Sequence, residues 1–597
     1  MAKKTISGKA FDLQILKRIY TFIIPYKKKF ILSVALTFLL AFLSPLRPIL
    51  IQYTIDHYIM KLDQDGLIKM MFLMLGLLVF QTIVQYVHTY LTNWLGQNVI
   101  KDLRVKLFRH IANLRLKYFD YTPIGTLVTR TISDLETIAD IFSEGLIVII
   151  GDLLQLFVII GVMFYKDWRL TLISLSTIPI LLVATRIFQY GINKTFREVR
   201  TQVAALNTFV QEHITGMSVV QIFNRQEEEF KRFKHINAEH MHANIRSVWY
   251  YSIFFPVVEL LSATSIGLLV WWGSGGVISH EVSLGNVIAF MMFINMLFRP
   301  IRELADKFNT LQMGMVSSER VFKVLDTNEF ITNSGSLISE IKGEIRFENV
   351  WFAYEENENV VHNENEPNWI LKDLSFEISA GKTLALIGAT GAGKSSIVNL
   401  VSRMYEFQKG RITIDGIDIR DYQLETFRKQ IAVVLQDVFL FSDTIQNNIT
   451  LKDSSISDFK VREASQIVGA DVFIEKLPGN YQFNVMERGA MLSVGQRQLI
   501  SFIRAFVFNP AILILDEATS SIDSESEELI QKATATITKN RTSIVIAHRL
   551  ATIQNADKII VMDHGRKIEE GNHQELLKRN GLYKELYEIQ FREDKIN

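Results

Sequence analysis

Apolar residues in the first half of the chain gather into six segments separated by polar stretches. Most of these segments approach the roughly 20 residues that a helix needs to cross the hydrocarbon core of a bilayer. The sixth is shorter, but its helical pattern continues toward residue 325. The segments cover residues 30–53, 67–87, 146–165, 170–187, 250–272 and 284–298. This pattern predicts an all-α membrane domain with six transmembrane helices.

The polar stretches between these segments alternate between short links and two long gaps that have a helical pattern. Basic residues concentrate in the long gaps and just before the first segment. They are Lys27–Lys29, Lys101, Arg104, Lys106, Arg109, Arg115, Lys117, Lys194, Arg197, Arg200, Arg225, Lys231 and Arg232. Because positive charge marks the cytoplasmic side of membrane helices, we expect two cytoplasmic hairpins and a cytoplasmic N-terminus. Residues 11–24 suit an amphipathic helix on the membrane surface, with a buried soluble helix as the alternative.

The second half of the chain changes to short apolar runs that are typical of buried strands. Such runs occur at residues 344–352, 383–387, 431–435, 511–515 and 542–547. Segment 355–368 is acidic and rich in asparagine, which predicts a flexible hairpin loop without an assigned role. We expect a transmembrane domain over residues 1–325, a linker over 326–342 and an α/β domain over 343–590.

Composition agrees with a chain that is partly embedded in a membrane. Its 597 residues are too many for one hydrophobic core, and hydrophobic residues make up 48% while charged residues make up 21%. The net charge of +1 provides no general attraction to nucleic acid. The lack of cysteine excludes disulfides, thiolate zinc sites and cysteine nucleophiles.

A few charged residues interrupt the apolar segments. Arg47, Asp152 and Glu259 could each contact a substrate in a cavity, or could form interhelical pairs or reach the membrane interface. Arg299 and Arg302 follow the sixth segment and could bind an anionic head group or simply anchor the helix end. The sequence does not decide between these interpretations.

A glycine-rich loop carries the clearest chemical signal in the chain. Residues 388–396 fit the pattern G-x-x-x-x-G-K-[ST], with an apolar strand before them and a helical pattern after them. The glycines allow backbone N–H groups to turn toward a polyphosphate, aided by the helix N-terminus. Lys394 is expected to reach the β- and γ-phosphates, and Ser395 is expected to hold Mg²⁺. The alternative is a glycine-rich turn that matches by chance.

Polar residues follow three of the later strand-like runs. Gln436 could ligate Mg²⁺ or orient a water molecule. Asp516 is placed to act on the metal shell, and Glu517 could polarise the attacking water as a general base. His548 could donate to the γ-phosphate, although a single histidine at a strand end is more often structural.

The order of these motifs along the chain resembles an ATP-binding cassette (ABC) ATPase. The set comprises the phosphate loop, Gln436, residues 492–496, Asp516 with Glu517, residues 520–523 and His548. Six helices ahead of such a domain resemble the ABC exporter half-transporters of the lipid A flippase and multidrug exporter type. Residues matching the first coupling region are Phe119, Asp120, Pro123, Gly125, Arg130 and Asp134. Those matching the second are Gly216, Phe223 and Glu227–Glu229. The implied fold is a six-helix membrane domain joined to an α/β P-loop nucleotide-binding domain with a helical subdomain.

The resemblance also implies roles for individual residues. Tyr354 would stack on adenine, the signature residues Ser493 and Gly495 would close over ATP bound to a second subunit, and Glu487 would contact the coupling hairpins. Asp523 would belong to the segment that links the two sites, while Val494 departs from the usual glycine. The residues expected to bind ATP are Tyr354, Gly388, Thr390, Gly391, Ala392, Gly393, Lys394, Ser395, Ser396, Gln436, Ser493, Gly495, Gln496 and Asp516. Those expected to hold Mg²⁺ are Ser395, Gln436 and Asp516, and those expected in catalysis are Gln436, Glu517 and His548.

Together these features predict ATP-driven export or flipping of lipids, drugs or other amphipathic compounds across the cell (inner) membrane by a dimer. Intact motifs permit a homodimer, and equally permit the intact half of a heterodimer. An ATP-gated channel or regulator is the less favoured alternative, because no continuous polar stripe runs along several helices. A soluble cassette ATPase acting on DNA or the ribosome conflicts with the apolar segments. The motifs do not identify the substrate.

Overall fold

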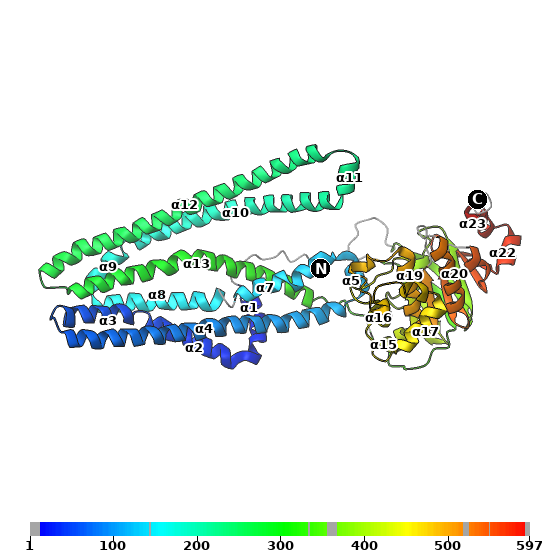
Figure 1. Cartoon of the computed structure of the whole chain (residues 1–597), viewed down its shortest axis with the longest axis horizontal. Coiled ribbons are helices and arrows are strands. Elements are labelled where there is room, and N and C mark those ends of the chain that lie inside the picture. The colour runs from blue at the N-terminus through cyan, green and yellow to red at the C-terminus, as the bar shows by residue number, and fades with distance from the viewer. Residues whose placement is uncertain are drawn as a thin grey trace. The chain divides into compact units, whose positions relative to one another are not determined.

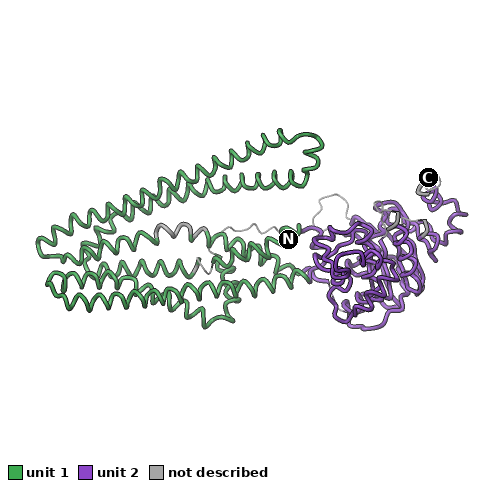
Figure 2. Tube along the Cα trace, viewed as in Figure 1, with its two compact units in different colours: residues 1–112, 123–328 green, residues 113–122, 329–597 purple. Residues whose placement is uncertain are grey.

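A computed structural model describes residues 12–141, 145–331, 333, 335–354, 367–516, 524–547 and 550–591. The chain divides into two compact units (Figure 2). Unit 1 comprises Met1–Ala112 and Pro123–Asn328, and unit 2 comprises Asn113–Thr122 and Glu329–Asn597. Residues 113–122, which we expected within the transmembrane domain, pack with unit 2.

Unit 1 is helical. Its helices are α1 (Leu13–Ile23), α2 (Lys27–Leu43), α3 (Leu46–Thr54), α4 (Gln64–Ala112), α6 (Ile124–Thr131), α7 (Ser133–Asp140), α8 (Leu146–Lys166), α9 (Trp168–Leu175), α10 (Ile178–Thr215), α11 (Met217–Ile222), α12 (Gln226–Ile278) and α13 (Leu284–Leu325). Helices α10 and α12 form a long hairpin closed by α11 (Figure 1). As predicted, α4, α10, α12 and α13 continue well past their apolar segments. The first expected hairpin is different: α8 begins at Leu146, where the third apolar segment begins, and the short helices α6 and α7 precede it.

The apolar parts of these helices are suited to a membrane. Within the described residues, five helical stretches are long and apolar enough to cross a bilayer, and a shorter apolar stretch covers Leu284–Pro300. In the most apolar part of α4, only 11% of the residues are buried within the chain. Such an apolar outer surface needs lipid or another protein to cover it.

The first apolar segment is not one continuous helix. It breaks between α2 and α3 at Ser44 and Pro45, with Pro48 in the first turn of α3. Proline lacks an N–H group and so cannot continue the hydrogen-bond ladder of α2. The sequence pattern alone predicts a single span here, and the break places Arg47 in the first turn of α3.

Unit 2 contains two sheets. The six-stranded sheet has the order β10-β9-β3-β8-β7-β6, in which only β10 is antiparallel, and the four-stranded antiparallel sheet has the order β2-β1-β4-β5. The strands are β1 (Ile345–Phe352), β2 (Leu371–Ile378), β3 (Thr383–Gly388), β4 (Lys409–Ile414), β5 (Ile417–Asp418), β6 (Ile431–Val434), β7 (Ile512–Asp516), β8 (Thr542–Ile546), β9 (Lys558–Asp563) and β10 (Arg566–Gly571).

The helices of unit 2 surround these sheets. They are α5 (Leu116–Tyr121), α14 (Lys394–Val401), α15 (Leu424–Lys429), α16 (Ile445–Thr450), α17 (Asp458–Val468), α18 (Asp471–Ile474), α19 (Val494–Val507), α20 (Ser524–Thr538), α21 (Leu550–Gln554), α22 (His573–Arg579) and α23 (Leu582–Phe591). Helices α16, α17, α19 and α20 pack against one another as a helical part of the unit.

Both faces of the six-stranded sheet are buried, which explains why its strands read as continuous apolar runs. Successive side chains of a strand point to opposite faces. In β3, Ala385 and Ile387 join the core shared with α17, α19 and α20. Leu384 and Leu386 join the other core, which contains α14 and the antiparallel sheet. The strand that leads into the phosphate loop is therefore held by packing on both of its faces.

Candidate nucleotide-binding site

The phosphate loop leaves the carboxyl end of β3 and leads directly into α14. Gly388, Gly391 and Gly393 have φ angles of 154°, 86° and 100°. A Cβ atom on Gly388 would lie 2.2 Å from the carbonyl oxygen of Met562, so only glycine fits where β3 pairs with β9. Gly391 borders open space, and its left-handed backbone alone favours glycine. This backbone is suited to turning N–H groups toward an anion.

Lys394 is the first residue of α14, and its ammonium group lies inside the loop. The residue is 8% exposed, and Nζ donates hydrogen bonds to the carbonyl oxygens of Gly388 at 2.7 Å and Ala389 at 3.0 Å. Burial lowers the pKa of Lys394, while the Asp516 carboxylate acts in the opposite direction. A buried cation at a helix N-terminus is suited to bind phosphate oxygens in exchange for these carbonyl groups.

Other predicted site residues collect at one edge of the six-stranded sheet. Strands β3, β8, β7 and β6 are parallel neighbours, so their carboxyl ends meet at this edge. Asp516 ends β7, and Gln436 follows shortly after β6. Gln436 and Ser395 are exposed, and Asp516 is half-buried. A hydroxyl, an amide oxygen and a carboxylate are donors that suit Mg²⁺.

Part of the predicted catalytic set lies outside the described residues. This applies to Glu517, to residues 520–523 and to His548, as well as to residues 355–366 of the acidic segment. Strand β7 leads directly to Glu517, and β8 ends shortly before His548. The roles assigned to these residues stay predictions.

Tyr354 lies between the phosphate loop and a small aromatic cluster. Its hydroxyl is 3.0 Å from Ser396 Oγ and accepts a hydrogen bond from Asn399 Nδ2 at 3.1 Å. Its ring packs edge to face against Phe352 and Tyr405, with centroid distances of 4.8 and 5.0 Å. Ser396 is buried, unlike Ser395. The sequence offers no signal for Asn399 or Tyr405, because both belong to this cluster only through packing.

The signature residues form the start of α19. Ser493 caps the helix in a reciprocal arrangement: Gln496 N donates to Ser493 Oγ at 3.2 Å, and Ser493 N donates to Gln496 Oε1 at 3.0 Å. Ser493 is exposed and Val494 is 45% exposed, whereas Gly495 is buried. Two neighbouring side chains and the helix N-terminus therefore lie at the surface of unit 2, where a ligand from outside the chain can reach them.

The charged residues of the membrane helices have different surroundings. Arg47 borders a groove of about 350 Å³ between α3 and α4. Asp152 accepts a hydrogen bond from Lys307 Nζ at 2.6 Å. Glu259 and Arg299 are exposed on α12 and α13. The side chain of Arg302 lies outside the described residues.

Comparison with known proteins identifies the family. Residues 30–301 match the family described as ABC transporter transmembrane region, and residues 371–520 match the family described as ABC transporter. An uncharacterized ABC transporter ATP-binding protein, YknV, of Bacillus subtilis is 40% identical over 98% of this chain and 96% of its own length. The chain belongs to the ABC transporter family.

Two other relatives of this transporter have more specific names. A putative multidrug export ATP-binding/permease protein, YgaD, of Bacillus subtilis is 36% identical over 96% of this chain and 99% of its own length. An ATP-dependent lipid A-core flippase of Desulfotalea psychrophila is 35% identical over 97% of this chain and 99% of its own length. These matches confirm the predicted resemblance to exporter half-transporters.

The ABC transporter combines a membrane region and an ATP-binding region in one chain. It is a multi-pass membrane protein and an ATP-driven exporter half, in which ATP hydrolysis is coupled to transport. The predicted fold class is confirmed, with apolar helices in unit 1 and the ATP-binding domain in unit 2.

Proposed function

We propose that this transporter exports or flips lipids, drugs or other amphipathic compounds across the cell (inner) membrane as one half of a dimer. The observation that carries the proposal is the fusion of apolar spanning helices to a phosphate loop that begins at a buried parallel strand. The names of the two relatives support the substrate class. We assign the transmembrane domain to residues 1–325, the linker to 326–342 and the ATPase domain to 343–590.

At the ATP site, residues of this chain hold the nucleotide and the metal. The phosphate loop and Lys394 bind the β- and γ-phosphates, and Tyr354 stacks on adenine. Ser395, Gln436 and Asp516 hold Mg²⁺, which when bound neutralises charge on the β- and γ-phosphate oxygens. Glu517 orients and polarises the attacking water.

Further residues complete the assigned site. His548 donates to the γ-phosphate, while Thr390, Ala392 and Ser396 help to shape the loop around the phosphates. We assign Ser493, Gly495 and Gln496 to a γ-phosphate held by the other subunit, which the exposed Ser493 at the helix N-terminus supports. Each ATP then lies between two chains, and binding draws the ATPase domains together.

Closure and release of the ATPase domains drive alternating access. ATP favours the closed dimer because only that state supplies contacts from both chains, and hydrolysis removes this preference. The basic residues of the long polar gaps support a cytoplasmic N-terminus and a cytoplasmic ATPase domain. Homodimer and heterodimer are both compatible with the motifs of this chain.

The test uses the full chain in lipid nanodiscs and in proteoliposomes. We expect a two-chain particle that hydrolyses ATP and moves a fluorescent lipid or a hydrophobic dye only when ATP is present. The matched control is Glu517→Gln, which should bind ATP while turnover falls on the order of 10²-fold.

Two results would count against the proposal. Near-normal hydrolysis by Glu517→Gln would remove the general-base assignment. Hydrolysis by the natural chain without ATP-dependent movement of either probe would contradict export of amphipathic compounds. A folded but inactive single-chain particle would exclude the homodimer and direct the search to a partner half.

A further inference from the structure

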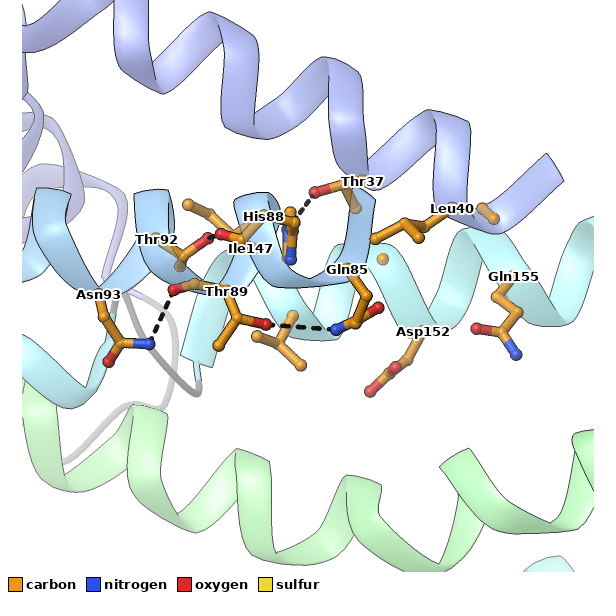
Figure 3. Close-up of a pocket in the computed structure, with 13 residues that line it drawn as sticks. Thr37, Leu40, Gln85, His88, Thr89, Thr92, Asn93, Ile147, Asp152 and Gln155 are labelled. Carbon is orange, nitrogen blue, oxygen red and sulfur yellow. Dashed lines mark hydrogen bonds between the residues drawn. The ribbon is translucent and has the colours of Figure 1, made fainter. Parts of the chain in front are cut away.

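A polar cavity of about 160 Å³ lies among α2, α4 and α8 of unit 1 (Figure 3). Gln85, Thr89 and Asn93 line it from α4, and Asp152 and Gln155 line it from α8. No predicted role in ATP binding involves these residues. Polar groups are costly in a membrane domain unless they meet water, a partner or a ligand, so their gathering at one cavity requires an explanation.

The polar residues of α4 occupy one face of the helix because they are spaced by four residues. Gln85 Nε2 donates to Thr89 Oγ1 at 3.3 Å, and Asn93 Nδ2 donates to the Thr89 carbonyl oxygen at 2.9 Å. Within the described part of the chain, the Gln155 amide has no hydrogen-bond partner. The cavity therefore presents amide and hydroxyl groups that retain hydrogen-bonding capacity.

The wall behind these groups is held in place by its own hydrogen bonds. His88 is 8% exposed, and its Nε2 lies 2.9 Å from Thr37 Oγ1 (Figure 3). Ser33 Oγ and Thr92 Oγ1 form a second buried pair at 3.0 Å. These contacts engage the three hydroxyl groups and His88 Nε2 inside the protein. The ligand-facing set is therefore Gln85, Thr89 and Asn93 of α4 with Gln155 of α8.

The carboxylate of the cavity has a cationic partner. Among the described residues that line the cavity, Asp152 supplies the only carboxylate, and Lys307 of α13 pairs with it at 2.6 Å. No cluster of three or more histidine, cysteine, aspartate or glutamate side chains suited to a metal occurs among the described residues. A neutral set of donors and acceptors matches hydroxyl groups, which both donate and accept. A phosphate would instead meet the Asp152 carboxylate, and the described lining residues include no lysine or arginine to offset that repulsion.

We infer that this cavity binds the uncharged, hydroxyl-rich head group of an amphiphile, such as the sugar of a neutral glycolipid. The inference rests on the proposed export function and specifies the substrate class. The cavity lies near the end of the second predicted span, residues 67–87, and near the first turns of α8. A head group held there would leave its acyl chains beside the apolar outer surface of the helices.

The test measures glycolipid binding and ATPase stimulation with the full chain in nanodiscs. The probes are a diglucosyl diacylglycerol, phosphatidylglycerol and phosphatidylcholine, each titrated separately. We expect the glycolipid to stimulate hydrolysis and to bind in native mass spectrometry. Thr89→Val and Gln155→Leu should each raise the half-maximal glycolipid concentration by about fivefold, because each removes a hydrogen-bonding group.

The matched control is Thr82→Val on the same helix. The Thr82 side chain is exposed and its hydroxyl is bonded to the Leu78 carbonyl oxygen at 2.8 Å, outside the cavity. This variant should behave like the natural chain. Equal responses of Thr89→Val and Thr82→Val, or stronger binding of phosphatidylglycerol than of the glycolipid, would overturn the inference.

The same samples separate this inference from the proposed function. Basal hydrolysis and ATP-dependent movement of the fluorescent lipid test export, and neither depends on the glycolipid. Native mass spectrometry tests glycolipid binding without ATP. If the fluorescent lipid moves but the chain binds the glycolipid no better than the two phospholipids, only the cavity assignment is overturned. Selective glycolipid binding that Gln155→Leu weakens would support the assignment.

Discussion

Tyr354 has an aromatic ring and a hydroxyl, and both make contacts within the chain. The hydroxyl bonds to Ser396 and Asn399 of α14, and the ring packs against Phe352 and Tyr405. The hydrogen bonds of the hydroxyl fix Tyr354 to the residues that follow the phosphate loop, whereas stacking on adenine would use the face of the ring. Substitutions can therefore separate the two contributions.

We expect Tyr354→Ala to weaken ATP binding roughly tenfold, because an aromatic ring that stacks on a base is lost. Tyr354→Phe keeps the ring and removes only the hydroxyl, so its ATP affinity should stay within about twofold to threefold of the natural value. Titration with a fluorescent ATP analogue measures both variants. Equal losses in Tyr354→Phe and Tyr354→Ala would show that the hydroxyl, and not stacking, controls affinity.

At the scale of elements, α5 is a six-residue helix that cannot be stable by itself. Its flanking backbone pairs with the linker, where Arg115 N donates to the Glu329 carbonyl oxygen at 2.9 Å. The Tyr405 hydroxyl donates to the Asp120 carboxylate of α5. Burial, aided by Asp120, raises the pKa of Tyr405, so this hydroxyl stays protonated as a donor. Because Tyr405 also touches Tyr354, contacts connect α5 to the phosphate loop.

Loss of this connection should affect coupling more than hydrolysis. We expect Tyr405→Phe to retain basal ATPase activity while lipid movement per ATP falls about twofold to fivefold, because one hydrogen bond to α5 is removed. The measurement is the ratio of lipid flipped to ATP hydrolysed in proteoliposomes. Tyr118→Phe is the matched control on α5, since within the described residues the Tyr118 hydroxyl has no partner. An unchanged ratio in Tyr405→Phe would exclude this role.

At the scale of the whole molecule, one chain carries both the phosphate loop and the signature, which in the proposed dimer belong to different ATP sites. The start of α19 is exposed at Ser493 and Val494, and Ala389 of the phosphate loop is exposed as well. If ATP lies between the phosphate loop of one chain and the signature of the other, we expect Val494 of one chain to approach Ala389 of its partner. The chain contains no cysteine, so introduced thiols would be the only ones present.

A chain carrying Ala389→Cys and Val494→Cys should therefore form a cross-linked species of twice the chain mass with a short bis-maleimide reagent. Cross-linking should increase with ATP in the Glu517→Gln background, because bound ATP holds the two ATPase domains together. Denaturing gel electrophoresis provides the readout, with each single-cysteine variant as a control. Cross-linking confined to one chain, or unaffected by ATP, would contradict the shared site.

Local patterns in the sequence were sufficient for much of the fold. The runs at residues 383–387, 431–435 and 511–515 predicted β3, β6 and β7 closely, because a strand buried on both faces must be apolar at nearly every position. The phosphate loop was also predictable, since positive φ angles and close approach require glycine at fixed spacing. The roles of Glu517 and His548 stay predictions from the motif order.

By itself the sequence determined the family, the apolar helices and the residues proposed to bind ATP, because these depend on short patterns along the chain. Only the tertiary structure decided which distant residues meet. It placed α5 with unit 2, and it joined Tyr354 to Asn399 and Tyr405. It also paired Asp152 with Lys307, 155 positions away, and placed that pair beside a polar cavity. Such contacts arise from packing between elements, which no local pattern of residues encodes.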